Sequence, residues 1–197
     1  MRPLVLASAS PRRVSLLRDA GFDFDILVPE VEEAHDAALT PEQLTLENAR
    51  RKALAGSHAR PGALVIGADT LVYVDGEPLA KPADLEEALA MVRRLSGRTH
   101  EVCTGVAFAC DGSIVRELHV ITHVTFKPLT DAVIRAYHAR VSPLDKAGAY
   151  GIQECTDMIL DRMSGSFTNV VGLPVDEVAV TLHELVGTGP FERMTVD

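Results

Sequence analysis

A short apolar run at the start of the chain ends in small hydroxyl residues, a proline and two adjacent arginines. Residues 3–7 read as a buried strand, and the turn that follows predicts a helix with Ser10 as its N-cap and Pro11 in its first turn. The free N–H groups at such a helix start attract anions, and the guanidiniums of Arg12 and Arg13 can clamp phosphate oxygens. The pattern favours a phosphorylated ligand over its alternative, a solvated helix start.

A carboxylate follows the most hydrophobic strand of the sequence. The continuous apolar run 63–68 predicts a strand buried on both faces, which we expect to end at Asp69 and Thr70. Ligands bind at the carboxyl ends of strands in open α/β sheets. A partly desolvated carboxylate there can act as a general base or hold a metal ion, although capping of the next turn is an equal alternative for Asp69.

Two further segments carry lysines that could neutralise a polyanion. Lys81 follows a predicted hairpin, and Lys146 lies in the glycine-containing stretch 145–153. That stretch reads as a tight loop against which a ligand packs closely. The amide of Gln153 offers both a donor and an acceptor, which suits the edge of a nucleobase. The alternatives are solvated lysines and an ordinary buried amide.

Several other classes are excluded by pattern or composition. The chain has no P-loop, no G-x-G-x-x-G fingerprint, no G-x-S-x-G elbow and no zinc-type histidine spacing, and we expect its seven histidines to be scattered surface or edge residues. A formal net charge of −9 over 197 residues argues against general affinity for nucleic acid or anionic membranes. The absence of a long apolar run and three cysteines without metal-type spacing favour a cytoplasmic protein with free thiols.

The elements that must position these residues predict a mixed α/β fold, with parallel strands early in the chain and hairpins later. On the helix that begins at Thr40, the residues Thr45, Asn48 and Lys52 share one face. We expect a single domain over residues 1–187 and a tail over 188–197. The expected helices are 12–20, 40–57, 84–96, 130–139 and 175–186, and the expected strands are 3–7, 24–28, 63–68, 71–79 (as a hairpin), 102–109, 114–126 and 158–163.

In combination, these segments resemble the Maf family of nucleoside triphosphate pyrophosphatases, in order from about residue 4 to residue 186. The segments that carry the resemblance are Ala7-Ser8-Ala9-Ser10-Pro11-Arg12-Arg13, Gly67-Ala68-Asp69-Thr70, Lys81-Pro82, Leu95-Ser96-Gly97-Arg98-Thr99-His100, Asp145-Lys146-Ala147-Gly148-Ala149-Tyr150-Gly151-Ile152-Gln153 and Val170-Val171-Gly172-Leu173-Pro174.

The resemblance implies a mixed twisted sheet with flanking helices, in two lobes around a deep cleft, similar to the inosine triphosphate pyrophosphatases. It implies hydrolysis between the α and β phosphates with a divalent cation, Mg²⁺ or Mn²⁺, and a possible homodimer. Arg12, Thr70 and Gln153 match the dTTP/UTP subgroup. The chain departs from the family where glycine often follows the glutamine, since it reads Glu154-Cys155-Thr156 there; this bears on secondary or modified-base substrates.

On this interpretation each candidate residue has a role. Asp69 would activate the attacking water, and Glu33, from an acidic segment, would join Asp69 in holding the metal. The other expected groups are Ser8, Arg12, Arg13 and Lys146 for the substrate, Lys52 and Lys81 for the charge of the leaving pyrophosphate, and Thr70 and Gln153 for the base.

Two alternatives remain open at this point. One is a house-cleaning pyrophosphatase for other nucleotides, which turnover of ITP or 7-methyl-GTP above that of dTTP would favour. The other is a nucleotide-sensing regulator, for instance of cell division, which would bind dTTP tightly without releasing pyrophosphate.

Overall fold

A mixed seven-stranded sheet forms the frame of the molecule in the computed structural model, which describes residues 2–36 and 38–186. The strand order is β2-β1-β3-β5-β6-β7, with β4 paired to β3 beside this path. The first three strands pair in parallel and the others are antiparallel, as the sequence predicts. The strands are β1 (Leu4–Ala7), β2 (Asp25–Leu27), β3 (Leu64–Val74), β4 (Glu77–Leu79), β5 (Thr99–Cys110), β6 (Ser113–Phe126) and β7 (Leu160–Ser164).

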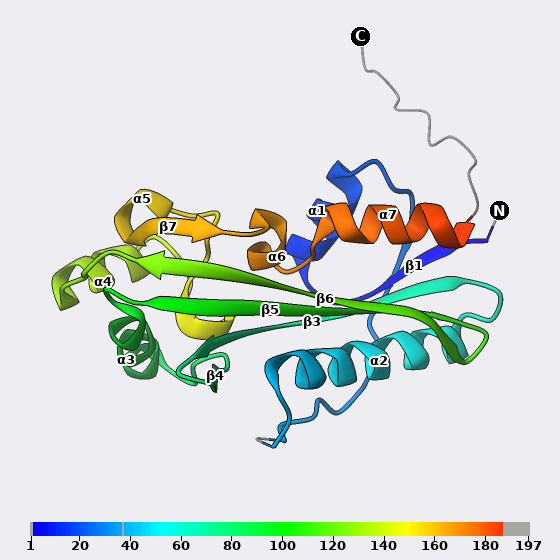
Figure 1. Cartoon of the computed structure of the whole chain (residues 1–197), viewed down its shortest axis with the longest axis horizontal. Helices are drawn as coiled ribbons and strands as arrows, with labels where there is room; N and C mark the ends of the chain where they lie inside the picture. Colours follow the sequence, from blue (N-terminus) through cyan, green and yellow to red (C-terminus); the bar gives the residue numbers. More distant parts are fainter. Residues whose placement is uncertain (1, 37, 187–197) are drawn as a thin grey trace, which may run out of the picture.

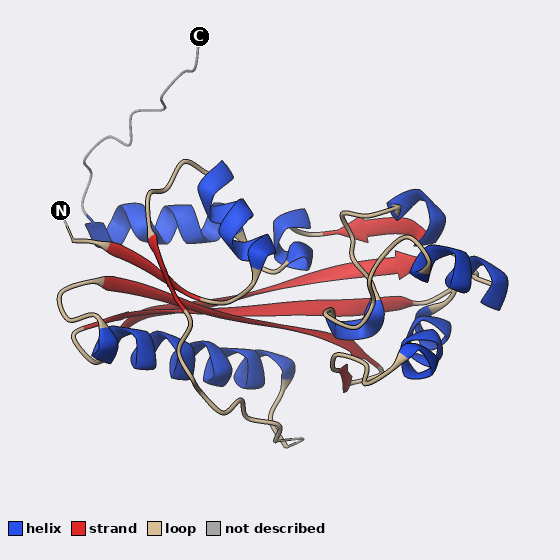
Figure 2. Ribbon diagram, turned by 180° about the vertical axis from the view of Figure 1, so that it is seen from behind, coloured by secondary structure: helices blue, strands red, loops and turns tan. Residues whose placement is uncertain are grey.

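Helices cover both faces of the sheet and one of its ends (Figure 1). The long helix α2 lies along one face, and α1, α6 and α7 lie on the opposite face; the view from behind in Figure 2 shows the same layers. The helices are α1 (Pro11–Asp19), α2 (Pro41–Ala59), α3 (Leu85–Leu95), α4 (Asp131–His138), the 3₁₀ turn η1 (Ala147–Ala149), α5 (Thr156–Ile159), α6 (Phe167–Val171) and α7 (Val175–Val186). Among the described residues, no helix is long and apolar enough to cross a membrane.

The helix starts follow the capping residues of the sequence. Ser10, Asp84 and Thr130 each accept a hydrogen bond from the backbone N–H three residues later, and Thr40 forms a complete capping box with Gln43. The predicted strand 158–163 is wrong at Met158 and Ile159, which belong to one turn of helix, α5, before β7. The expected tail over 188–197 lies outside the described residues.

Two glycines allow α2 to lie directly on the sheet. A Cβ atom on Gly67 would lie 2.3 Å from the carbonyl oxygen of Ala49, and one on Gly105 would lie 2.5 Å from the carbonyl carbon of Thr45. Any side chain at either position would therefore push the helix away. This close contact fixes the helix that carries Lys52 against the strand that carries Asp69.

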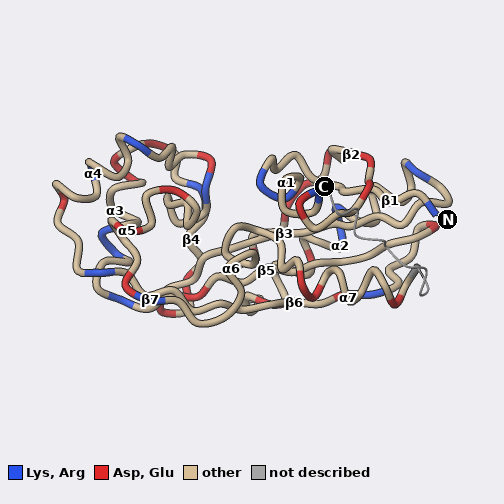
Figure 3. Tube along the Cα trace, turned by 90° about the horizontal axis from the view of Figure 1, so that it is seen from above, with Lys and Arg blue, Asp and Glu red and all other residues tan. Residues whose placement is uncertain are grey.

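The other face of the sheet carries two hydrophobic cores. The first, which we call the terminal core, packs α1 and α7 on β1, β3 and β5, and the second, the α3–α4 core, packs α3 and α4 on the far halves of β3 and β5. Along β3, the residues Leu64, Ile66 and Ala68 belong to the terminal core and Val72 and Val74 to the α3–α4 core. Figure 3 shows the corresponding two groups of helices, joined by the long strands.

A polar belt, buried except at the half-buried Thr70, separates the two cores. It consists of Thr70, Thr104 and Thr122 on three adjacent strands, together with Asn169 of α6. The Thr70 and Thr104 hydroxyls lie 2.9 Å apart, Thr104 donates to the carbonyl of Asn169 (3.1 Å), and the Asn169 amide donates to Thr122 (2.9 Å). Two lobes therefore share one sheet, with polar groups at the boundary.

Candidate active site

The site lies where β3 loses its parallel neighbour. β1 pairs with β3 only as far as Gly67 and β4 begins to pair at Val72, so no strand of the described residues covers this edge at 68–71. The expectation that β3 ends at Asp69 is wrong, because β3 continues to Val74 as one arm of the hairpin with β4. It is β1 that ends here, with its last pair to β3 at Gly67, so Asp69 lies beside the carboxyl end of a parallel strand.

A cavity of about 450 Å³ opens at this edge and brings the candidate residues together. Ser8 is the one candidate outside the lining; it is buried beside the cavity, where its hydroxyl accepts from the N–H of Ser10 and from Arg13. The candidates that line the cavity are Arg12, Arg13, Glu33, Lys52, Asp69, Thr70, Lys81, Lys146 and Gln153.

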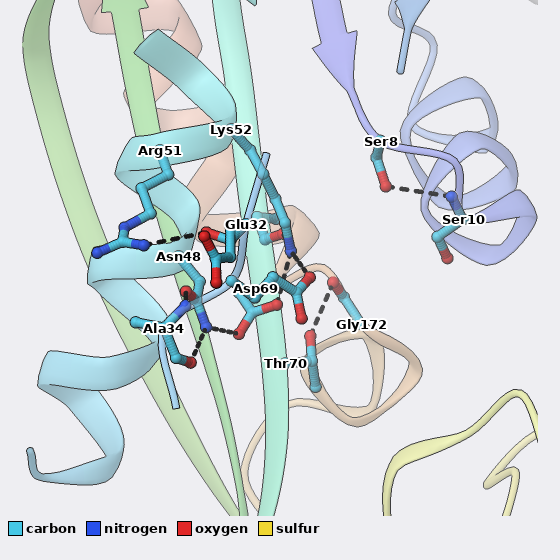
Figure 4. Close-up of polar contacts among 12 residues, drawn as sticks. Ser8, Ser10, Glu32, Ala34, Asn48, Arg51, Lys52, Asp69, Thr70 and Gly172 are labelled. Carbon is cyan, nitrogen blue, oxygen red and sulfur yellow. Dashed lines mark hydrogen bonds and ion pairs between the residues drawn. The ribbon is translucent and has the colours of Figure 1, made fainter. Parts of the chain in front are cut away.

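Two carboxylates converge on one ammonium group. Lys52 Nζ lies 2.7 Å from Asp69 Oδ1 and 2.7 Å from Glu33 Oε1, and Figure 4 shows Lys52 reaching from α2 to Asp69 on β3. Burial alone would raise the pKa of Glu33, but the hydrogen bond and charge of Lys52, with a contribution from Lys81, hold that pKa below its usual value. Glu33 is therefore a carboxylate that stays ionised at neutral pH.

Asn48 orders both carboxylates, and sequence analysis assigned it no role. It lies one turn before Lys52, is only 2% exposed, and donates through Nδ2 to Asp69 Oδ2 (3.2 Å) and to the Ala34 carbonyl (3.3 Å). Its Oδ1 accepts from the Ala34 N–H (2.7 Å), which ties the irregular segment that carries Glu33 to α2. The sequence did carry one signal for this role, because the spacing of Asn48 and Lys52 places both on the same face of the helix.

Arg13 is fixed in place by contacts with three parts of the chain. Its Nε donates to the Gly172 carbonyl (2.7 Å), Nη2 donates to Thr70 Oγ1 (3.0 Å) and Nη1 to Ser8 Oγ (3.4 Å). Burial lowers the pKa of Arg13, and the nearby carboxylate of Asp69 opposes this effect. The bonds hold the plane of the guanidinium at the wall of the cavity, which is the pre-organisation that anion binding needs.

An ion pair crosses the cavity from one lobe to the other. Arg12 of α1 donates to Asp145 Oδ2 (2.8 Å), and Lys146 Nζ lies 3.0 Å from Asp145 Oδ1. Burial would raise the pKa of Asp145, but the hydrogen bonds from Lys146 and Arg12 hold it low. Lys146 is 7% exposed, and its ammonium also contacts the Ser142 carbonyl (2.8 Å) and Glu154 (3.4 Å). Its role in substrate binding stays a prediction.

The residues present fit a divalent cation that is held partly by a substrate. Glu33 and Asp69 converge closely enough to share Lys52, but among the described residues no group of three or more His, Cys, Asp or Glu side chains could hold a metal ion. Mg²⁺ is commonly bound by one or two carboxylates together with substrate phosphates and water. The donor set matches that pattern better than a site made of protein ligands alone.

Comparison with protein families decides the relationship: the model of the family described as "Maf-like protein" matches residues 3–185. This chain belongs to the Maf family. Among its relatives, a protein named dTTP/UTP pyrophosphatase from Akkermansia muciniphila is 48% identical over 183 residues, which are 93% of this chain and 96% of the relative. A second of the same name, from Symbiobacterium thermophilum, is 50% identical over 184 residues, which are 93% and 94% of the two chains.

The fold of this Maf protein is also found in a solved structure, that of a HAM1 protein from Coxiella burnetii. The similarity has a TM-score of 0.59 at 17% identity and covers 93% of this chain and 100% of the other. The predicted mixed α/β fold with flanking helices is thereby confirmed.

Proposed function

We propose that this Maf protein hydrolyses dTTP and UTP to the nucleoside monophosphate and pyrophosphate. The observation that carries the proposal is the convergence of Asp69 and Glu33 on Lys52, in the same cavity as the paired arginines. Carboxylates beside a cluster of cations suit attack by water on a phosphate chain. The names of the two relatives give the substrate class.

In the proposed mechanism, the chain's own groups bind the triphosphate and prepare the water. Ser8, Arg12, Arg13 and the start of α1 hold phosphate oxygens, and Lys52 and Lys81 offset charge on the pyrophosphate as it leaves. Asp69 accepts a proton from the attacking water, since its position is fixed by Asn48 and Lys52. Glu33 and Asp69 would hold a divalent cation, Mg²⁺ or Mn²⁺, which would supply positive charge and lower the pKa of water.

Recognition of the base falls to the opposite side of the cavity. Gln153 presents an exposed amide there, and Thr70 lies at the boundary of the two lobes. The Thr70 hydroxyl is held by Arg13 and Thr104, so it links the base side of the cavity to the phosphate side. A cytoplasmic location, which the composition favours, and a homodimer, which the family resemblance implies, stay predictions.

The test of the proposal is pyrophosphate release from a panel of nucleoside triphosphates with Mg²⁺ or Mn²⁺. We expect turnover of dTTP and UTP, with the monophosphate as co-product. Faster turnover of ITP or 7-methyl-GTP than of dTTP would instead support a purine nucleotide as the substrate. Tight dTTP binding without pyrophosphate release would instead support a nucleotide-sensing protein.

Replacement of the proposed general base should separate binding from turnover. Asp69→Asn keeps the shape of the side chain but removes its capacity to accept a proton, so kcat should fall by about 100-fold or more while nucleotide affinity stays within a few-fold. Steady-state kinetics and calorimetric titration measure the two quantities. The matched control is Asp161→Asn, which changes an exposed aspartate on β7. Near-normal turnover in the Asp69 variant would rule out the assigned role.

A further inference from the structure

The loop that carries Gln153 has a strained backbone that the surrounding structure maintains. Ala149 adopts φ +62°, a left-handed conformation that residues other than glycine rarely adopt. The neighbouring Gly148 lies so close to β3 that a Cβ there would be 3.2 Å from the side chain of Val72. Such strain persists where the surroundings over-determine the backbone. The contacts that hold this loop therefore identify the residues that maintain its conformation.

Side chains outside the loop supply those contacts. His138 of α4 bonds to the Ala149 carbonyl (3.1 Å), and the Tyr150 hydroxyl bonds to His100 on β5 (2.8 Å). His100 is 2% exposed, so the expectation that the histidines are surface or edge residues is wrong for this one. It packs edge-on against the rings of Phe126 and Tyr150.

Tyr137 of α4 makes the most specific of these contacts. Its hydroxyl donates to the Gly151 carbonyl (3.0 Å) and accepts from the Gly151 N–H (2.9 Å), so one phenol pairs with both backbone groups of a single residue. The Tyr137 side chain is fully buried. Burial raises its pKa to about 12, so the hydroxyl keeps its proton and remains a donor at neutral pH.

The phenol lies at the base of the turn that presents Gln153. The same Gly151 carbonyl also accepts from the Glu154 N–H (3.2 Å), which closes the turn 151–154. Within this turn Ile152 is buried in the α3–α4 core, whereas Gln153 is exposed and lines the cavity. A shift of Gly151 would therefore move the amide of Gln153 directly.

We propose that Tyr137 is a positioning residue for recognition of the nucleobase, because its hydroxyl fixes the turn from which Gln153 reaches the base. The inference rests on the proposed function, in which a pyrimidine base binds beside Gln153. It predicts that an amino acid of α4, outside the cavity lining, influences selectivity between nucleotides. It also gives the buried polar contacts of this lobe a use beyond stability.

The test is Tyr137→Phe, which removes one oxygen atom from a buried ring. We expect KM for dTTP to rise about tenfold and kcat to stay within about twofold. The preference in kcat/KM for dTTP over dGTP should therefore fall about tenfold. The reason is that the loss of one hydrogen bond to a buried backbone group has a free energy equivalent to about a tenfold change in an equilibrium constant. The matched control is Ser57→Ala, because the Ser57 hydroxyl is also buried, donates to the Leu54 carbonyl and accepts from the Gly112 N–H, but lies outside the cavity lining. That control should leave both parameters unchanged.

A double variant separates positioning from general stability. If Tyr137 acts through Gln153, Tyr137→Phe should cause no further loss of selectivity when Gln153 is already alanine. An equal loss of selectivity in both backgrounds would overturn the inference. So would changes in kcat and KM for dTTP and dGTP that run in parallel with a change in melting temperature. If Tyr137→Phe does not fold, Gly151→Ala displaces the same turn, because its Cβ would lie 2.9 Å from Glu154 Oε1, and an unchanged preference would overturn the inference.

Failure of the proposed function is distinguishable from failure of this inference. A wild-type protein that releases no pyrophosphate from any nucleotide contradicts the proposed function. Calorimetric titration with dTMP and dGMP still tests the inference in that case. Lower affinity of Tyr137→Phe for dTMP, with unchanged affinity for dGMP, would support positioning, and equal ratios in variant and wild type would oppose it.

Discussion

At the scale of single residues, the site depends on buried and half-buried polar groups that have hydrogen-bond or ion-pair partners within the site. Asn48, Lys52 and Arg13 each join two or three segments that are distant in sequence. Unpaired, such groups would cost stability, because desolvation of a polar group without a hydrogen bond is unfavourable. Paired as they are, they set the positions of Asp69, Glu33 and Thr70 before any ligand binds.

The buried His100 makes the free energy of unfolding depend on pH. Burial lowers its pKa from 6.5 to about 4. Between pH 4 and pH 6.5, His100 is therefore protonated in the unfolded chain but neutral in the folded protein. The stability contributed by neutral His100 is therefore present above pH 6.5 and is lost as the pH falls toward 4. The linkage amounts to about 2 kcal/mol of unfolding free energy between pH 7 and pH 5.

Urea unfolding at pH 7 and pH 5 measures this effect. The variant His100→Gln, which has no imidazole to protonate, should show a smaller loss between the two pH values than the wild type. Substitution of the exposed His119 by glutamine is the control and should keep the wild-type difference. An identical pH difference in all three proteins would contradict the assignment.

At the scale of elements, the helix starts were predictable and the course of β3 was not. Ser10, Thr40, Asp84 and Thr130 carry their own local signal, because a capping side chain bonds to a backbone group only three residues away. Asp69 interrupts an apolar run and so imitates a strand end. Its place inside β3 depends on pairing with β5, which is remote in sequence. The role of Asn48 escaped prediction for the same reason, because its partners Ala34 and Asp69 are also distant in sequence.

The contact between α2 and the sheet gives a prediction at this scale. In Gly105→Ala the new methyl group would lie 2.5 Å from the α2 backbone, so α2 must shift and the unfolding free energy should fall by about 1–3 kcal/mol. Because α2 carries Lys52 and Asn48, kcat should fall as well. Chemical denaturation and steady-state kinetics measure both effects.

The control is Gly21→Ala, at a position where a Cβ meets no atom within 4 Å but φ is +84°. That change introduces backbone strain without moving α2, so it should lower stability and leave kcat intact. Equal losses of kcat in the two variants would show that the close approach of α2 does not position the site.

At the scale of the whole molecule, three strands pass through both lobes. β3 and β5 contribute side chains to both hydrophobic cores, and β6 packs Leu118 at one core and Phe126 in the other. The polar belt and the Arg12–Asp145 ion pair add contacts across the boundary, but neither could hold two separate lobes together by itself. The cavity between the lobes is thus built on a continuous sheet, which limits how far its two walls can separate.

Shared strands predict that the two cores unfold together, as the expectation of a single domain requires. The chain has no tryptophan, and its three tyrosines all lie on β3, α4 and the following loop, beyond Thr70 toward the α3–α4 core. Tyrosine fluorescence therefore reports that lobe, while Phe22→Trp would place a separate probe in the terminal core. In a urea titration, both probes and far-UV circular dichroism should give one midpoint. Separate midpoints would mean that the lobes are independent units, because β3, β5 and β6 could then lose one core while retaining the other.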